Sequence, residues 1–127
     1  LLLGPDAESE QWVSQIARPL KLDFTICNKI RTDDNQVIID LPKMPLTGRH
    51  IILVDDVISS GGTLACMAEL CLAQGAERVD VLVTHPLFAG QAMKRLKQSG
   101  IHEIWSTDSI VHETNAFSLS RLFSQYL

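Results

Sequence analysis

The stretch IILVDDVISSGGT, residues 51–63, decides the fold of this chain. Four apolar residues lead into two adjacent carboxylates, Asp55 and Asp56, and a run of hydroxyls and glycines follows. A short apolar run before such a turn predicts a buried strand, which we expect over residues 51–54. Open α/β sheets bind their ligands beyond the carboxyl ends of the strands. We therefore expect Asp55 and Asp56 to emerge at that end, in a ligand site.

The residues of this stretch suit a phosphorylated sugar. Successive side chains of a strand face opposite ways, so the two carboxylates have different tasks, such as binding sugar hydroxyls or a cation. Glycines let backbone N–H groups approach a ligand closely, and the helix that follows adds partial positive charge at its start. The candidates for binding a phosphate are Ser59, Ser60, Gly61, Gly62 and Thr63. The whole pattern favours a phosphorylated ribose.

Strand and helix patterns alternate along the rest of the chain. Further apolar runs predict strands at 1–3, 24–27, 37–40, 79–83 and 103–105. Apolar residues at helical spacing occur at 12–17, 64–72, 88–96 and 119–126. Gly75 and Gly100 fall where helices are expected to end. The alternation predicts an α/β fold with a mostly parallel sheet flanked by helices on both faces. We expect Phe117 and the closing helix to pack back on this sheet.

One segment departs from the alternation. The sequence NKIRTDDNQ, residues 28–36, separates two strand-like runs, is too short for a helix and is rich in turn-forming residues. We expect residues 24–40 to form a hairpin arm that stands off the sheet. By spacing alone, Lys29 and Arg31 would belong to a solvated hairpin.

The composition limits the function classes. With 127 residues, 46% hydrophobic and 20% charged, residues 1–127 suit a single domain with one core. A net charge of −4 without any block of like charge predicts neither nucleic acid nor a membrane as a partner. The cysteines, Cys27, Cys66 and Cys71, form no CxxC pattern, which favours a reducing cytoplasm. The abrupt apolar start, LLLGPD, suggests part of a longer protein.

Two other protein classes place acidic or glycine-rich residues after a strand. Response-regulator receivers carry an acidic pair on their first strand, whereas here the pair lies in mid-chain and the next strand is followed by Thr84 and His85. A P-loop requires GxxxxGK[ST], which the sequence lacks. The order of the residues argues against both classes.

The stretch at 51–63 resembles the phosphoribosyl-diphosphate (PRPP) motif of the type I phosphoribosyltransferase superfamily. Four further segments resemble one family within it, the ribose-phosphate pyrophosphokinases or PRPP synthetases: GPDAES at 4–9, NKIR at 28–31, THPLFAG at 84–90 and STDSI at 106–110. The likeness covers nearly the whole chain, but only the C-terminal half of that family's proteins. It implies a type I phosphoribosyltransferase-like fold, a missing N-terminal half and a homo-oligomer.

The resemblance implies a ribose-phosphate diphosphokinase. Such an enzyme transfers the pyrophosphoryl group of ATP to the 1-hydroxyl of ribose 5-phosphate, giving PRPP and AMP, with Mg²⁺ as cofactor. Asp55 and Asp56 would bind the ribose hydroxyls, and residues 59–63 the 5-phosphate. Because most adenine contacts and a metal-binding histidine of the family come from the N-terminal half and a neighbouring subunit, we expect the 127 residues alone to bind ribose 5-phosphate without turnover.

The resemblance also assigns the cations and the first loop. Lys29 and Arg31 would be catalytic, closing over the ATP phosphates from the arm. Asp6 and Ala7 would bind the pyrophosphate, and Asp6 would help to hold Mg²⁺.

That first loop departs from the family pattern, which usually has two glycines where this chain has Glu8 and Ser9. Side chains at these positions hinder close approach of the backbone to a pyrophosphate, and Glu8 adds a like charge. Two alternatives stay open, and the altered loop is a hint for only the first of them. One is a non-catalytic, PRPP-synthetase-like regulatory protein, and the other is a type I phosphoribosyltransferase, which would need an additional segment to bind its base.

Overall fold

The computed structural model describes residues 1–33 and 36–127. The strands of its main sheet are β1 (Leu2–Gly4), β2 (Phe24–Ile26), β5 (His50–Ile58), β6 (Arg78–Pro86), β7 (Ile104–Thr107) and β8 (Asn115–Phe117). They lie in the order β2-β1-β5-β6-β7-β8, and every neighbouring pair is parallel. The predicted α/β class with a mostly parallel sheet is confirmed.

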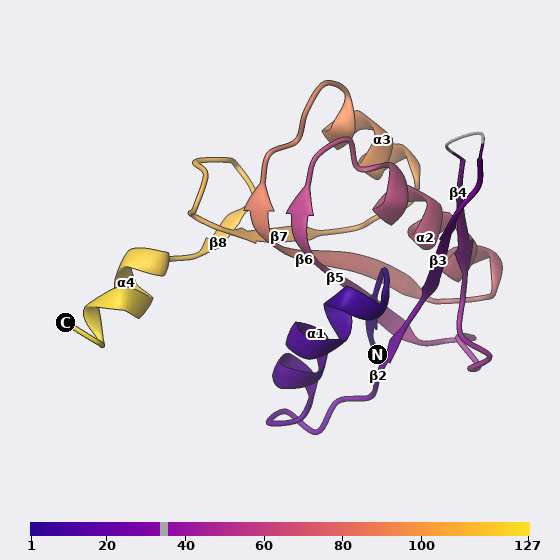
Figure 1. The fold of residues 1–127 in the computed structure, drawn as a ribbon, viewed down its shortest axis with the longest axis horizontal. Coiled ribbons are helices and arrows are strands. Elements are labelled where there is room, and N and C mark those ends of the chain that lie inside the picture. Colours follow the sequence, from indigo (N-terminus) through magenta and orange to yellow (C-terminus); the bar gives the residue numbers. More distant parts are fainter. Residues whose placement is uncertain (34–35) are drawn as a thin grey trace.

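Helices lie on both faces of this sheet (Figure 1). One face carries α1 (Glu10–Ala17), which follows a short 3-10 turn, η1 (Ala7–Ser9). The other face carries α2 (Gly62–Ala73) and α3 (Ala92–Gln98). Parallel strands need such crossover helices, because a tight turn cannot return the chain to the same edge of the sheet.

The alternation of strand side chains divides the interior into two cores. Leu53 of β5 faces α2 and belongs to the larger core, whereas its neighbour Val54 faces α1. The central strands are apolar on both faces, as expected for a sheet covered twice. Side chains without any solvent exposure, such as Val79 and Val81 of β6, anchor the middle of the domain. β5 and β6 thus form a rigid base for the residues at their carboxyl ends.

The strands around the acidic pair are longer than predicted. β5 continues through Asp55 and Asp56 to Ile58, so the prediction that the carboxylates emerge beyond a strand ending at 54 is wrong. The reason is that Val57 and Ile58 remain paired with β6, which also runs past its predicted end to Pro86. The two carboxylates therefore sit on a paired, regular backbone.

The hairpin arm is shorter than the predicted range of 24–40. β2 is an edge strand of the main sheet, because Phe24 and Ile26 have a core to join beside α1. The part that stands off is an antiparallel pair of β3 (Asn28–Arg31) and β4 (Val37–Asp40). Residues 34–35 of the predicted arm lie outside the described residues.

The predicted helix over 88–96 begins too early. α3 starts at Ala92, and Phe88 lies in the preceding loop with a φ of +46°. There its ring packs on that of His112, with the ring centroids 4.3 Å apart. The predicted helix ends are confirmed at Gly75 and Gly100, which both have a φ of +88°.

The closing segment does not pack back on the sheet, so that prediction is wrong. α4 (Leu119–Ser124) has no buried residue and extends away from the domain (Figure 1). Phe117 and Phe123 are 51% and 60% exposed. A helix of six residues presents too little apolar surface to offset the ordering of a return loop. No helix within 1–33 and 36–127 is both long and apolar enough for a membrane span.

Candidate functional site

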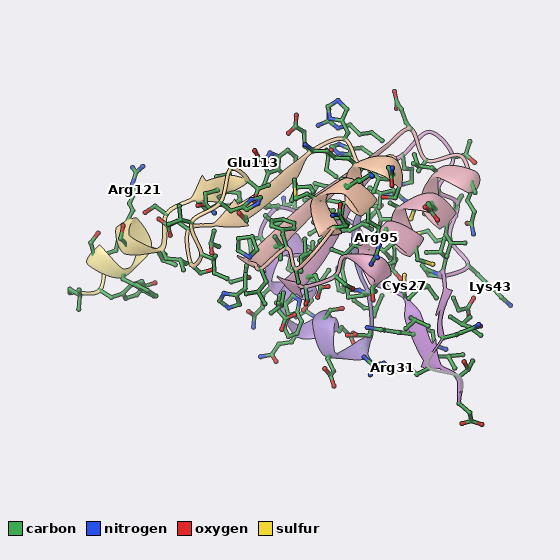
Figure 2. The ribbon with its side chains drawn as sticks, turned by 90° about the horizontal axis from the view of Figure 1, so that it is seen from above. Cys27, Arg31, Lys43, Arg95, Glu113 and Arg121 are labelled. Carbon is green, nitrogen blue, oxygen red and sulfur yellow. The ribbon has the colours of Figure 1, made fainter. Side chains whose placement is uncertain are left out.

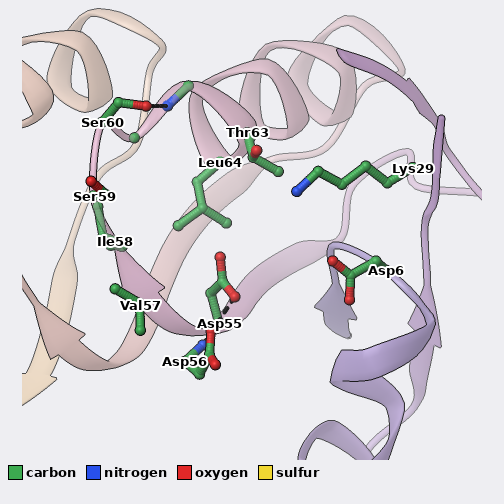
Figure 3. A pocket seen from close by; sticks show the side chains of 12 residues that line it. Asp6, Lys29, Asp55, Asp56, Val57, Ile58, Ser59, Ser60, Thr63 and Leu64 are labelled. Carbon is green, nitrogen blue, oxygen red and sulfur yellow. Dashed lines mark hydrogen bonds between the residues drawn. The ribbon is translucent and has the colours of Figure 1, made fainter. Parts of the chain in front are cut away.

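A pocket with a cavity volume of about 240 Å³ lies at the carboxyl end of β5 (Figure 3). Its wall combines the loop before η1, the arm strand β3, the end of β5 and the start of α2. The lining residues are Asp6, Lys29, Asp55, Asp56, Val57, Ile58, Ser59, Ser60, Gly61, Gly62, Thr63 and Leu64. Segments that lie more than 50 positions apart in the sequence thus meet in one polar cavity.

The structure brings together most of the residues that the sequence singled out. The lining includes both carboxylates of β5, the whole 59–63 loop, Asp6 and Lys29. Ala7 and Arg31 do not line it. Val57, Ile58 and Leu64 were missed as lining residues, because an apolar residue beside a polar motif carries no sequence signal of its own.

The two carboxylates of β5 differ in their surroundings. Asp55 is partly buried, whereas Asp56 is exposed and its backbone N–H donates a 2.9 Å hydrogen bond to Oδ1 of Asp55. Burial raises the pKa of Asp55 to about 7, and the negative charges of Asp56 and Asp6 add to the rise. A carboxylate that resists ionisation in this way gains from any ligand that supplies hydroxyl donors or positive charge.

The 59–63 loop turns β5 into α2. Gly61 caps the helix with a φ of +74°, a conformation in which a residue with a Cβ is strained. The first N–H groups of a helix lack intrahelical partners and suit an anion. The hydroxyl of Ser60 accepts a long hydrogen bond, 3.4 Å, from the N–H of Gly62. The loop thus contributes backbone amides and hydroxyls to the lining of the pocket that also contains the two carboxylates.

Asp6 has a structural task as well as a place in the pocket. It caps η1 by accepting a 3.2 Å hydrogen bond from the N–H of Ser9 at Oδ1. The fully buried Ser9 returns the contact, since its Oγ accepts a 3.4 Å hydrogen bond from the backbone N–H of Asp6 and its hydroxyl donates to the carbonyl oxygen of Asp6 over 2.5 Å. This capping box fixes the loop with a serine at one of the two positions where the resemblance predicts glycine. Glu8 is exposed and does not line the pocket.

The arm delivers one of its two cations to the pocket. Lys29 pairs with the buried Ile39 of β4, and its amine extends between Thr63 and Asp6 (Figure 3). Arg31 lies two residues further along the same face of β3 and is exposed, outside the pocket lining (Figure 2). Lys29 is therefore placed beside the site by packing of the arm against α2, whereas Arg31 does not line the pocket.

The pocket offers hard oxygen donors for a divalent cation. Across the described ranges, 1–33 and 36–127, no group of three or more His, Cys, Asp or Glu side chains is arranged to hold a metal ion. Mg²⁺, however, is usually bound by one or two carboxylates that share it with substrate phosphates and water. Asp6, Asp55 and Asp56 all line the pocket, so it contains oxygen donors of the kind that such a shared site uses.

The back of the 59–63 loop is held by residues that the sequence did not reveal. Nη1 of Arg95, on α3, donates a 3.0 Å hydrogen bond to the carbonyl oxygen of Ser60. The fully buried Leu96 packs directly behind Gly61. Neither residue belongs to a motif, and only the three-dimensional packing of α3 against α2 places them there.

Comparisons with known proteins identify the family of this chain. The chain is 35% identical over 126 residues to ribose-phosphate pyrophosphokinase 1 of Archaeoglobus fulgidus, covering 99% of this chain and 44% of the relative. It is 32% identical over 127 residues to the ribose-phosphate pyrophosphokinase of Methanosarcina acetivorans, covering 100% of this chain and 45% of the relative. The chain matches the C-terminal part of these relatives and spans less than half of their length.

A solved structure gives the same result for the fold. The phosphoribosylpyrophosphate synthetase from Mycobacterium smegmatis superposes with a TM-score of 0.76 and 24% sequence identity, over 98% of this chain and 42% of that chain. The family model described as the phosphoribosyl transferase domain matches residues 1–119. Because this match covers almost the entire chain, the protein belongs to the phosphoribosyl transferase domain family.

Proposed function

We propose that this chain is the C-terminal half of a ribose-phosphate diphosphokinase, which makes PRPP and AMP from ribose 5-phosphate and ATP. One observation carries the proposal: a single pocket combines two adjacent carboxylates, Asp55 and Asp56, with the amide- and hydroxyl-rich 59–63 loop. Carboxylates accept hydrogen bonds from sugar hydroxyls, and the loop suits a phosphate. The relatives named ribose-phosphate pyrophosphokinase support the choice of reaction.

The substrate would lie across the pocket with its two ends in different surroundings. The ribose hydroxyls would donate to Asp55 and Asp56, and the 5-phosphate would accept hydrogen bonds from the 59–63 loop. At one end the sugar hydroxyls would donate hydrogen bonds to the carboxylates. At the other end the phosphate oxygens would accept hydrogen bonds from the amides and hydroxyls of the loop. The 1-hydroxyl is left facing the arm and Asp6, where the second substrate would bind.

In the proposed reaction the oxygen of the 1-hydroxyl attacks the β-phosphorus of ATP in line, and its proton is released to solvent water. The bond between the β-phosphorus and the oxygen that bridges it to the α-phosphorus breaks, and AMP leaves with that electron pair. Charge builds up on the transferring oxygens, which Lys29 and Arg31 would offset from the arm. Mg²⁺, when bound, would neutralise the pyrophosphate oxygens, with Asp6 as a protein ligand and Ala7 beside the pyrophosphate.

The proposal extends to the parts that this chain does not supply. An N-terminal half, as long as the unmatched part of the relatives, would complete the ATP site, and the whole protein would act as a homo-oligomer. The 127 residues alone would bind ribose 5-phosphate without turning it over. Arg31, exposed in this structure, would reach the ATP phosphates only when the arm closes.

A non-catalytic regulatory role is the second candidate, and the first loop favours it. Ser9 occupies Oδ1 of Asp6 with its N–H, which leaves this carboxylate less free for a cation. Glu8 adds an exposed negative charge next to the place proposed for the pyrophosphate. Such a protein would bind ribose 5-phosphate or PRPP as a signal.

The deciding experiment measures AMP and PRPP formation by the full-length protein with ATP, ribose 5-phosphate and Mg²⁺. A variant with Lys29→Ala and Arg31→Ala should lose nearly all turnover, whereas Lys43→Ala with Lys97→Ala, two exposed lysines outside the pocket, should retain it. Binding of ribose 5-phosphate without turnover would establish the regulatory role. Absence of both binding and turnover would reject the proposed function.

A further inference from the structure

We propose that Arg95 is a positioning residue, which orients the backbone amides of the 59–63 loop toward a phosphate without touching the ligand itself. The inference rests on the proposed function in its choice of ribose 5-phosphate as the ligand. It goes beyond that function by assigning control of the loop to α3, an element that contributes nothing to the lining of the pocket.

The first observation is a contact across 35 positions of the sequence. Nη1 of Arg95 donates to the carbonyl oxygen of Ser60 over 3.0 Å. Arg95 is exposed on α3 and stands outside the pocket lining (Figure 2). The guanidinium therefore contacts the loop from outside the pocket lining.

The geometry of the peptide bond turns this contact into an orientation. The peptide between Ser60 and Gly61 is planar and trans, so its carbonyl and its N–H point in opposite directions. Holding the carbonyl toward α3 directs the N–H of Gly61 toward the pocket, which Gly61 lines. A loop with two glycines has many accessible conformations, so a fixed carbonyl removes alternatives that would turn this amide away.

Further contacts show that the back of the loop is shaped by the segment that contains Arg95. The N–H of Ala89, just before α3, donates to the carbonyl of Ser59 over 2.9 Å. A Cβ on Gly61 would lie 3.1 Å from Cγ of Leu96. These contacts fix the distance between α3 and the loop. Arg95 adds a charged donor at the carbonyl of Ser60, the residue just before the N-cap of α2, Gly61.

The charge of Arg95 should also strengthen the amide that it orients. A guanidinium bound to a carbonyl polarises the peptide, which makes its N–H a better donor. A hydrogen bond from a charged group contributes more than a neutral one. We therefore expect the effect of Arg95 to be largest for ligands that carry a phosphate.

The test compares Arg95→Gln, Arg95→Lys and the control Lys97→Gln, which removes an exposed charge from the same helix. The affinities of the 127-residue chain for ribose 5-phosphate and for inorganic phosphate are measured by calorimetry. Amide resonances of Gly61 and Gly62 are followed by ¹H–¹⁵N NMR.

We expect Arg95→Gln to weaken ribose 5-phosphate binding roughly 5- to 20-fold. Its melting temperature should stay within about 2 °C of the wild type, because surface substitutions away from the core change stability little. The free-state amide resonance of Gly61 should shift. Arg95→Lys should restore affinity to within about threefold, since a lysine still supplies a charged donor. Lys97→Gln should leave both the affinity and the Gly61 amide unchanged.

Unchanged affinity and an unchanged Gly61 amide in Arg95→Gln would overturn the proposal. So would a loss of affinity that merely follows a loss of thermal stability. If the wild type binds inorganic phosphate in an Arg95-dependent way but shows no added affinity for ribose 5-phosphate, the proposed function fails and the positioning role stands. If neither ligand moves the loop amides of the wild type, the positioning role fails as well.

Discussion

The backbone N–H of Asp56 donates a 2.9 Å hydrogen bond to Oδ1 of Asp55, so one carboxylate of the pair binds the peptide of the other. Asp55 is the partly buried member, and burial raises its pKa to about 7. The exposed Asp56 faces the other side of the strand. The pocket therefore contains one carboxyl group whose charge changes near neutral pH.

Asp55→Asn should stabilise the folded chain at alkaline pH. The pKa of Asp55 rises from 3.8 to about 7 on folding, so the folded state binds more protons between these values and the free energy of unfolding falls as the pH rises through this window. Asparagine avoids the penalty and can still accept the hydrogen bond from Asp56. After allowance for solvent screening, we expect a gain on the order of 1–3 kcal/mol at pH 8 that disappears near pH 4.

Thermal unfolding at pH 4, 6 and 8 checks this expectation. Asp56→Asn, which removes the adjacent exposed carboxylate, is the matched control. A difference between Asp55→Asn and the wild type that does not change with pH would contradict the assignment of the titrating group to Asp55.

Lys29 and Arg31 should contribute differently to the affinity of the 127-residue chain for PRPP. Lys29 extends into the pocket, whereas Arg31 is exposed outside its lining. Lys29→Gln should therefore weaken PRPP binding by about 5- to 20-fold, since a charged donor to a pyrophosphate is lost. Arg31→Gln should change it less than about twofold. Calorimetric titration of PRPP into both variants measures this, and equal losses would mean that the arm closes without the N-terminal half.

Gly61→Ala should disturb the 59–63 loop more than its backbone angle alone predicts. Gly48 is the control, since its φ of +69° is close to the +74° of Gly61 and nothing lies within 4 Å of an added Cβ. Gly48→Ala should cost about 1 kcal/mol, which is the usual strain of alanine in the left-handed region. Gly61→Ala should cost more, because its Cβ would lie 3.1–3.3 Å from Leu96.

Urea unfolding of both alanine variants measures the two losses of stability. Calorimetry with ribose 5-phosphate shows whether the affinity falls as well. We expect Gly61→Ala to lose affinity and Gly48→Ala to keep it. Equal destabilisation of the two variants would show that the Leu96 side chain moves aside and that it does not hold the loop in place.

Local sequence patterns were sufficient to predict the class of fold and most of the pocket. The strand over 51–54 and the glycine-rich helix start that follows it are encoded by neighbouring residues, so both were predictable. The apolar residues at 24–27 were assigned to the arm because their partners, Leu2 and α1, are distant in the sequence. The extension of β5 to Ile58 was missed for the same reason, since pairing with β6 sets where the strand ends.

Longer-range relations were beyond sequence patterns. Phe117 has the alternation and the bulk of a core residue, yet the short β8 strand leaves it 51% exposed. Arg95 carried no signal at all, because its contact with Ser60 depends on how two helices pack. The spacing of apolar residues shows which face of a helix or strand is apolar, but not which other element packs against that face.

A cluster around the buried Asp80, at the opposite end of β5 and β6, supports the sheet rather than the pocket. Asp80 has no solvent exposure and accepts hydrogen bonds from Nε of Arg78 at 2.7 Å and from the N–H of Glu103 at 2.9 Å. Its Oδ2 also lies 2.6 Å from Nε2 of His50. Asp80 thus ties the amino ends of two central strands to the start of β7.

Asp80→Ala should therefore destabilise the domain by about 2–4 kcal/mol, because it leaves the Arg78 guanidinium and the Glu103 amide without their acceptor. Asp23→Ala is the matched control: Asp23 forms a 2.6 Å ion pair with Arg49 but is 67% exposed, so its loss should cost less than about 1 kcal/mol. Urea unfolding measures both costs. Ribose 5-phosphate affinity at 15 °C should stay within about twofold of the wild type in each variant, since the cluster and the pocket share no residue. A selective loss of affinity in Asp80→Ala would show that strain at one end of β5 reaches Asp55 at the other.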